Sequence, residues 1–348
     1  MRYIIGILVL GALFFAIGCD NELDIIEEGG DIPIVYGFLS ASDTIQLIRV
    51  ERAFVDENTS GLVLAQNPDN FFYDENTTVS LVNLDTEESF QLNRIDGNEI
   101  GFARDTTGIF ASRPNILYSL DSELLNFDEQ DEETIFELQI QRPGELPLVT
   151  AQSRVVGESS IRRPLENNPS LDFGNFINPV EIRWRKGVNA RIYDVMIQFN
   201  YQERPILGGD WVNRFVVWRI AQNIEDESTN ESQIEITESP ENFYNFLAST
   251  IPVDDSVVRR AVDADVMVVG GGGGTNATDE VDIVEYIRVE GANLGITATQ
   301  VVPSVSNLSE GLGIFGSTFT TVLTEVRLTD LTKDSLNNGV ITRNLGFQ

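Results

Sequence analysis

Residues 180–199, with the sequence VEIRWRKGVNARIYDVMIQF, decide the fold class of this chain. Apolar and polar side chains alternate through the first six positions, which places Trp184 and the apolar residues two and four positions before it on one face. Residues 187–190 supply a turn, and apolar side chains at every second position of residues 193–199 mark a returning strand. A period of two residues indicates half-buried strands, so this stretch predicts a strand, a turn and a return strand, with Trp184 in the core.

The same pattern continues on both sides of these two strands. Short apolar or alternating runs separated by turn residues occur at residues 34–39, 45–50, 79–84, 90–95, 108–110, 116–118, 135–140, 146–156, 212–220, 233–236 and 261–269. Residues 96–98, Asp-Gly-Asn, predict a hairpin turn because Asp-Gly and Gly-Asn tolerate positive φ. Short strands at this spacing predict an all-β fold built from β-sandwiches.

One short helix is expected to interrupt the strands. Ser239 suits the N-cap and Pro240 the first turn, and the apolar residues between 243 and 251 form one stripe. We expect this helix to cover the second half of the chain.

A run of five glycines occupies residues 270–274. A phosphate-binding loop would require a lysine and a following helix. Residues 279–290 are instead acidic, with apolar side chains at 281, 283, 287 and 289, and they read as a further strand. The glycines are therefore interpreted as a mobile hairpin tip.

Residues 1–19, MRYIIGILVLGALFFAIGC, form a segment of a different kind. Arg2 precedes an apolar run that is too short for a stable membrane span but has the size of the apolar region of an export signal. The run ends in Ala16-Ile17-Gly18-Cys19, and Cys19 is the single cysteine of the chain. This ending resembles the lipobox of bacterial lipoproteins, whose cysteine receives a diacylglycerol before cleavage. The resemblance implies a signal peptide at residues 1–18 and a membrane anchor at Cys19; an ordinary cleaved signal with an incidental cysteine is the alternative.

Changes in amino-acid composition divide the rest of the chain into a tether, two domains and a linker. Residues 19–31 read as a lipidated acidic tether, and residues 157–178, rich in Pro, Asn, Ser and Gly, read as a linker between β-domains at residues 32–156 and 179–348. The strand order of the first domain resembles transthyretin-like or immunoglobulin-like modules, and the two strands around Trp184 resemble two strands of fibronectin type III domains. We therefore expect two β-sandwich domains, the second with the inserted short helix.

The composition excludes several classes of function. The chain of 348 residues has a formal net charge of −32, from 55 acidic and 23 basic residues, which argues against binding to nucleic acid. It contains no histidine, which removes serine–histidine and cysteine–histidine catalysis and histidine zinc sites. No motif indicates a cofactor, a metal site or an enzyme.

Three groups of residues remain as candidate ligand contacts. Acidic clusters at residues 128–133, 225–227 and 254–255 lack the spacing of a calcium loop, so solvated loops are favoured over calcium binding. The arginine pairs 162–163 and 259–260 could grip a carboxylate or phosphate, although internal ion pairs are favoured. The aromatic residues 71–73 and Trp211 either stack on a sugar or peptide or are buried.

One modification pattern recurs. Four sites match the Asp-(Ser/Thr)-apolar O-glycosylation pattern of exported Bacteroidota proteins, with acceptors at Thr44, Thr106, Ser256 and Ser335.

Two stretches carry a family resemblance. Residues 303–316, PSVSNLSEGLGIFG, and residues 33–45, PIVYGFLSASDTI, resemble segments of a family of Bacteroidota outer-membrane lipoproteins of unknown function. Genes of that family commonly neighbour TonB-dependent transporters of the SusC/RagA kind. The acidic residues after Cys19 resemble the signal that sends lipoproteins of bacteria related to Bacteroides to the outer face of the outer membrane. The resemblance implies a non-enzymatic, lipid-anchored, outward-facing accessory protein with an outer-membrane β-barrel as partner. A free-standing surface module that binds glycan or protein is the main alternative, and a calcium-dependent hydrolase is the third.

Overall fold

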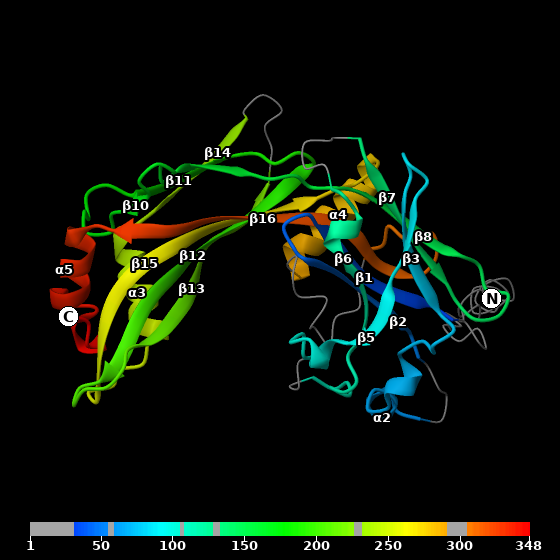
Figure 1. The fold of residues 1–348 in the computed structure, drawn as a ribbon, viewed down its shortest axis with the longest axis horizontal. Coiled ribbons are helices and arrows are strands. Elements are labelled where there is room, and N and C mark those ends of the chain that lie inside the picture. The colour runs from blue at the N-terminus through cyan, green and yellow to red at the C-terminus, as the bar shows by residue number, and fades with distance from the viewer. Residues whose placement is uncertain (1–30, 55–58, 105–107, 128–132, 226–231, 291–304) are drawn as a thin grey trace, which may run out of the picture. The chain divides into compact units, whose positions relative to one another are not determined.

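The computed structural model describes residues 31–54, 59–104, 108–127, 133–225, 232–290 and 305–348. Residues Ile32–Gln348 form one compact unit, shown in Figure 1. Its strands are β1 (Pro33–Ser40), β2 (Ile45–Arg52), β3 (Thr78–Asn83), β4 (Ser89–Gln91), β5 (Asn93–Asp96), β6 (Ile116–Asp121), β7 (Ile135–Gln141), β8 (Val149–Arg154), β9 (Ser160–Arg163), β10 (Ser170–Leu171), β11 (Val180–Arg185), β12 (Ala190–Pro205), β13 (Val212–Glu225), β14 (Gln233–Glu238), β15 (Val257–Gly272) and β16 (Leu312–Leu328). Its α-helices are α2 (Gly61–Leu64), α3 (Pro240–Thr250), α4 (Ala277–Glu290) and α5 (Asp330–Asn338), and short 3-10 helices occupy Pro68–Asn70, Gly97–Glu99, Ser122–Leu124 and Arg343–Leu345.

The protein is mostly β, with several sheets. The largest sheet has nine strands, in the order β13-β12-β15-β16-β1-β2-β6-β5, with β10 paired to β16. It is antiparallel except for the pairs that β16 forms with β1 and with β10, which are parallel. The long strands β12, β13, β15 and β16 lie side by side in Figure 1.

Two smaller sheets each share a hydrophobic core with part of the large sheet. The sheet β4-β3-β7-β8 contributes Leu81, Leu138 and Ala151 to a core that also contains Ile48 of β2. The sheet β14-β11-β9 contributes Trp184 to a second core with Phe199 of β12 and residues of α3 and α5. The large sheet therefore carries strands from both of the predicted domains, whose boundaries stay a prediction.

The alternation of buried and exposed side chains explains why these segments form strands. In β7 every second residue is buried, and in β11 Ile182 and Trp184 are fully buried while Arg183 between them is only partly so. Burying one face of a strand against a neighbouring layer stabilises it, at roughly 25 cal/mol for each Å² of apolar surface removed from water. The two strands predicted around Trp184 are confirmed as part of β11 and β12, with Trp184 buried; they belong to different sheets and do not pair with each other.

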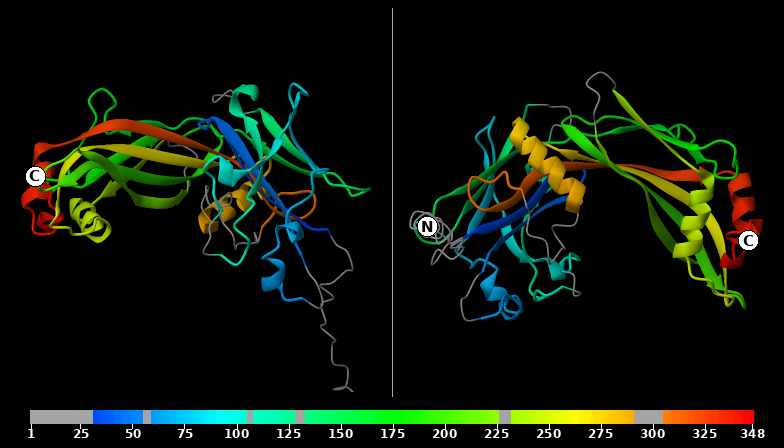
Figure 2. Two further views of the ribbon diagram at one scale, coloured as in Figure 1. Left: turned by 60° about the horizontal axis from the view of Figure 1, so that its bottom comes forward. Right: turned by 180° about the vertical axis from the view of Figure 1, so that it is seen from behind.

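The interpretation of the glycine run and the residues after it was wrong. Residues 270–272 belong to β15 and are buried, and residues 277–290 form the helix α4 rather than a strand. Helix α4 lies beside the large sheet (Figure 2). Its residues Ile283, Tyr286 and Ile287 share a hydrophobic core with residues of β1, β12 and β16. A Cβ added at Gly271 would lie 2.7 Å from the Ile287 side chain, so the glycines make room for the helix.

Several other expectations need correction. Residues 96–98 do not form a tight hairpin turn, because Gly97 begins a 3-10 helix and β6 starts only at Ile116; residues 108–110 are not a strand. The segment 157–178, predicted as a linker, includes β9 and β10. The described residues contain four α-helices, where one was expected; that one, α3, begins at Pro240 after Ser239 as predicted.

Candidate binding surfaces

The predicted lipidation site lies outside the described residues. Ala16, Ile17, Gly18 and Cys19 belong to residues 1–30, as does most of the acidic tether, and Thr106 also lies outside the described ranges. Among the described residues, no helix is both long and apolar enough to cross a membrane.

The remaining predicted glycosylation sites lie on separate elements. Thr44 is exposed in the turn between β1 and β2. Ser256 is exposed before β15, and its hydroxyl lies 2.6 Å from the carboxylate of Asp254. Ser335 is half-buried in α5. The fold does not bring these three residues together.

The aromatic residues 71–73 are buried, so the hypothesis that they form a ligand platform is wrong. Phe71, Phe72 and Tyr73 are at most 5% exposed. The Arg104 guanidinium lies 4.9 Å from the centre of the Phe71 ring and 5.1 Å from that of Phe110. These rings form an apolar wall around a buried cation.

Beside these rings lies a buried cluster of charges that the sequence did not reveal. The Glu51 carboxylate is 3.0 Å from Arg104 and 3.7 Å from Arg49, and Arg49 donates to the Asn115 amide oxygen over 2.9 Å. Burial lowers the pKa of Arg49 to about 10, an effect that Glu51 opposes. Burial also raises the pKa of Tyr36, and the Glu51 carboxylate raises it further. Because its charged members are almost completely buried, we assign this cluster a structural role.

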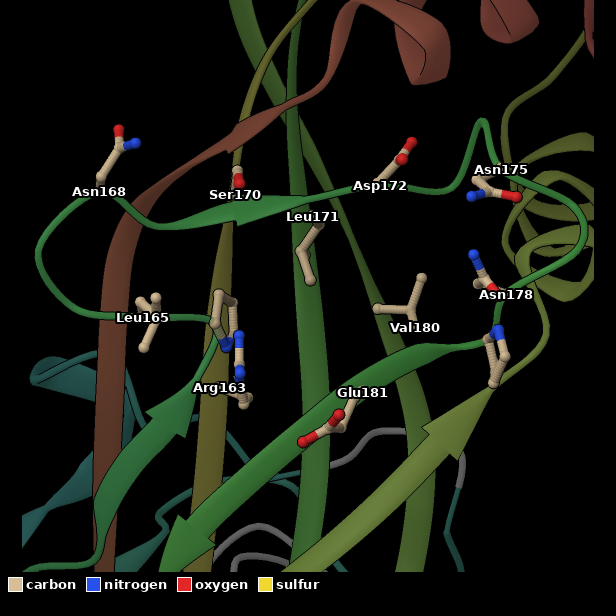
Figure 3. Close-up of a pocket in the computed structure, with 12 residues that line it drawn as sticks. Arg163, Leu165, Asn168, Ser170, Leu171, Asp172, Asn175, Asn178, Val180 and Glu181 are labelled. Atoms are coloured by element: carbon tan, nitrogen blue, oxygen red, sulfur yellow. The ribbon is translucent and has the colours of Figure 1, made fainter.

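A pocket of about 320 Å³ opens among residues of β9, β10, β11 and their connections (Figure 3). In Figure 3 the side chains of Leu171 and Val180 point into the framed space, whereas Asn168 points away from it. The lining is mixed, with amides such as Asn178 and the charged residues Arg163 and Glu181. Part of this polar lining is structural, because Asp172 accepts hydrogen bonds from the Gly174 amide and from Thr329.

A second candidate is the stack at the loop end of the hairpin formed by β12 and β13. The guanidinium of Arg204 lies 4.5 Å from the centre of the Trp211 ring, and that of Arg260 lies 4.4 Å from it. Arg260 also donates to the Gln202 side chain over 2.7 Å, which holds it in place. Cation–π contacts of this kind fix the positions of both guanidinium groups.

The register of the strands shows which side chains share a face with this stack. Arg260 on β15 pairs with Gln202 on β12, and on β13 Phe215 pairs with Asn200 and Arg219 with Met196. Directly paired residues of antiparallel strands lie on the same face of a sheet. Because the other face of these strands is buried in the core, this face points outward. We call the group Arg204, Trp211, Phe215, Val217, Arg219 and Arg260 the Trp211 surface.

The Trp211 surface has an unusual number of exposed apolar side chains around it. Phe215 is 63% exposed, and in the hairpin loop Leu207 is 98% and Ile206 60% exposed. Contiguous exposed apolar surface rimmed by polar groups is typical of interaction sites. Aromatic residues and arginine are also the types enriched where protein interfaces derive most of their binding energy.

The carboxylates on the same face, those of Asp263 and Asp265, accept hydrogen bonds from neighbouring side-chain amides. The Asn200 amide donates to Asp263 over 2.9 Å and to Asp265 over 3.0 Å, and Gln198 also donates to Asp265. In the part of the chain that the structure describes, no group of three or more His, Cys, Asp or Glu side chains could hold a metal ion.

The predicted arginine pair 259–260 separates into two roles. Arg259 is buried and forms an ion pair with Glu203 at 2.8 Å, which confirms the favoured interpretation for this residue. Arg260 joins the Trp211 surface, so the two neighbours point to opposite faces of β15. Sequence reasoning singled out Trp211 and Arg260 but missed Arg204 and Phe215. Nothing in the local sequence around these two residues indicated that they meet.

Comparison with known proteins gives distant structural neighbours. No protein-family model matches the chain, and no curated protein sequence matches it. Three fibronectin type III domains of chicken contactin 1 align over 70% of this chain and 60% of that one, with 9% identity and a TM-score of 0.20. A two-domain fibronectin type III segment of chicken tenascin covers 66% and 85% of the two chains, with 12% identity and a TM-score of 0.15. A bacterial ice-binding adhesin covers 86% and 66%, with 10% identity and a TM-score of 0.18.

This chain thus spans only about 60% of the contactin structure, and all three likenesses are distant. At this level of similarity, they carry no argument about function.

Proposed function

We propose that this chain is a non-enzymatic, lipid-anchored accessory protein of an outer-membrane complex, with a TonB-dependent nutrient transporter as its barrel partner. The acyl chains on Cys19 hold it in the outer membrane, and the folded part faces the cell exterior. The observation that carries the proposal is the Trp211 surface, an outward face of arginine and aromatic side chains flanked by exposed Leu207 and Ile206.

The proposed domain architecture also fits a docking role. We propose that the chain contains two β-sandwich domains, the first transthyretin-like or immunoglobulin-like and the second fibronectin-III-like. The two small sheets and the two separate cores support this division. In such a protein the rigid sheets present a surface, and no movement of catalytic groups is required.

Isolation of the complex tests the proposal. The full chain, carrying an affinity tag at its C-terminus, is purified from native membranes solubilised in a mild detergent, and co-purifying proteins are identified by mass spectrometry. We expect a β-barrel outer-membrane protein at near-equal amount. Recovery of the chain without any β-barrel partner would overturn the proposal.

A free-standing capture module is the second candidate, and the pocket in Figure 3 favours it. Amide and charged side chains around Leu171 and Val180 suit a hydroxyl-rich ligand such as a glycan. Binding of a glycan by the purified full chain, lost in Asn178→Leu and kept in Phe215→Ser, would support this candidate over the first.

A further inference from the structure

We propose that the outer edge of β13 accepts an extended, acidic segment of the partner as an additional strand, anchored by the Trp211 surface. This inference rests on the proposed function and deepens it, because it names the chemistry of the partner. It concerns one edge and one face of the large sheet, at the end where the β12–β13 hairpin lies.

The edge of β13 is open. In the described residues β13, Val212–Glu225, pairs with β12 alone and ends the nine-stranded sheet. Outside strand pairing, no described backbone group bonds to the backbone of this strand. Its inner face packs on α3, where the Trp218 ring stacks on Phe246 with ring centres 5.7 Å apart, and near its end the Asn223 side-chain amide donates to the Arg288 carbonyl of α4. An open edge carries a row of unpaired main-chain donors and acceptors, which an added strand satisfies.

The side chains along this edge favour a partner over solvent. Natural edge strands are commonly protected by charge, proline or a covering element. Here Val212, Phe215 and Val217 are 46%, 63% and 40% exposed. These apolar side chains lie next to the open edge and would be covered by a strand added there.

The charge at this edge is opposite to that of the protein as a whole. The chain has a net charge of −32, yet three arginines, Arg204, Arg219 and Arg260, lie on this face, where Asp263 and Asp265 accept hydrogen bonds from neighbouring amides. Among the ion pairs of the described residues, none involves any of these three arginines. Screening limits interactions between exposed charges to about 8 Å at physiological salt, so a docked segment responds to these local arginines more than to the distant acidic surface.

The arginines are also preorganised. Trp211 holds two guanidinium groups against its ring, and the side-chain nitrogen Nε of Arg204 is buried there without a hydrogen-bond partner. Guanidinium groups held in place lose less conformational entropy when they bind carboxylates. A carboxylate side chain on the added strand is the matching group.

The same charges argue against a second copy of this chain as the occupant. Pairing β13 with β13 of another molecule would bring Arg214 and Arg219 of both copies to one interface. Like charges across an interface cost binding energy. The occupant is therefore a different, acidic chain.

Synthetic peptides test the inference directly. The probe is a capped peptide of alternating valine and glutamate with a fluorescent label, and its binding to the full chain in detergent is measured by anisotropy. Two matched probes have lysine in place of glutamate, or the same sequence with N-methylated central amides. We expect the glutamate peptide to bind at least about tenfold more tightly than either matched probe. Equal binding of the lysine peptide overturns the charge argument, and equal binding of the N-methylated peptide overturns strand addition.

Variants locate the site. Arg219→Glu combined with Arg260→Glu should weaken the glutamate peptide by at least about tenfold, whereas Arg162→Glu combined with Arg185→Glu, the same charge change at exposed residues of the small sheet, should not. Far-ultraviolet circular dichroism and thermal unfolding check that both double variants fold. An equal effect of the two, or concentration-dependent dimerisation through β13, contradicts the inference.

Co-purification separates this inference from the proposed function. If wild type and the R219E/R260E variant recover the same barrel protein in equal amount, the proposed function stands and the inference falls. If wild type recovers no barrel protein but binds the acidic peptide at β13, the proposed function falls and the edge retains its acceptor role.

Discussion

Gly313 on β16 lies directly beside Val35 on β1, in the parallel pair that joins the first strand of the chain to the last. A Cβ built on Gly313 would overlap the carbonyl oxygen of Val35 and lie 2.8 Å from its amide nitrogen. Gly313 also has a φ of 128°, a conformation that side chains disfavour. Two residues far apart in the sequence thus meet at a spacing that only glycine permits.

Gly313→Ala should strongly destabilise the protein. Both the strained φ and the contact with Val35 oppose an added methyl group, and we expect a loss of more than about 3 kcal/mol in the free energy of unfolding. Urea denaturation measures this loss. Gly61→Ala is the control, because a Cβ at Gly61 meets nothing within 4 Å and should leave stability nearly unchanged. A Gly313→Ala protein as stable as wild type would contradict this packing.

Glu51→Gln should also be strongly destabilising. It leaves Arg49 and Arg104 buried without the carboxylate that offsets their charge, and breaking a buried ion pair in this way costs about 3–5 kcal/mol. The matched substitution Glu235→Gln breaks the exposed pair with Arg183 and should cost less than about 1 kcal/mol. Equal losses in the two variants would show that the cluster is not isolated from water.

Glu280→Gln should change how stability depends on pH. Burial raises the pKa of Glu280 above its ordinary value of 4.5, although Arg191 and a hydrogen bond from the Gly274 amide oppose the shift. The folded chain therefore holds this proton more tightly than the unfolded chain, and stability falls as the pH rises from 4.5 through the raised pKa. The glutamine cannot titrate, so the stability of Glu280→Gln relative to wild type should increase over that interval.

The measurement is the free energy of unfolding as a function of pH. Glu285→Gln, which removes the same charge from a more exposed position on α4, controls for net charge. Parallel pH profiles of wild type and Glu280→Gln would contradict the expected shift.

Thr332→Val should destabilise the protein, because the Thr332 hydroxyl holds the backbone that follows β10. The Thr332 hydroxyl of α5 accepts hydrogen bonds from the backbone amides of Phe173 at 2.8 Å and Gly174 at 3.1 Å. Valine has the same shape but cannot accept, so the Phe173 amide loses its partner while the Gly174 amide keeps Asp172, and stability should fall by about 1–3 kcal/mol in denaturant unfolding. Thr324→Val, at an exposed position of β16, should change stability by less than about 0.5 kcal/mol. A neutral Thr332→Val would show that water replaces the hydroxyl.

Cys19→Ala should release the protein from the membrane. Without the thiol no acyl chain is attached, and stable anchoring then has no covalent lipid. Fractionation of cells followed by immunoblotting measures the shift to the soluble fraction, and circular dichroism of the released chain checks that its strands form. Retention of the variant in the membrane would contradict lipidation as the anchor.

The sequence predicted most strands because their signal is local. In β7 and β11 the alternation is set by one buried face, and it is visible without knowing the partner strand. Helix α4 was missed because its apolar residues at 281, 283, 287 and 289 also fit a period of two. Including Tyr286 gives the helical spacing of Ile283, Tyr286 and Ile287. Asn276, whose side chain accepts from the amides of Thr278 and Asp279, was a recognisable N-cap.

The candidate surface was only partly predictable. Trp211 and the pair 259–260 stood out as residue types, but opposite faces of β15 give the two arginines different roles. Arg204 and Phe215 gave no signal of their own, because their proximity depends on the register of β12 with β13 and β15.

By itself, the sequence determined the local properties of this protein: the alternating strands, the helix after Ser239, the negative charge and the predicted lipid attachment at Cys19. These depend on a residue and its near neighbours. The tertiary structure alone decided that β1 pairs with β16, that the glycine run lies under α4, and that Trp211 lies between Arg204 and Arg260. Such contacts join residues distant in sequence, and they form only where packing and register bring the chain together.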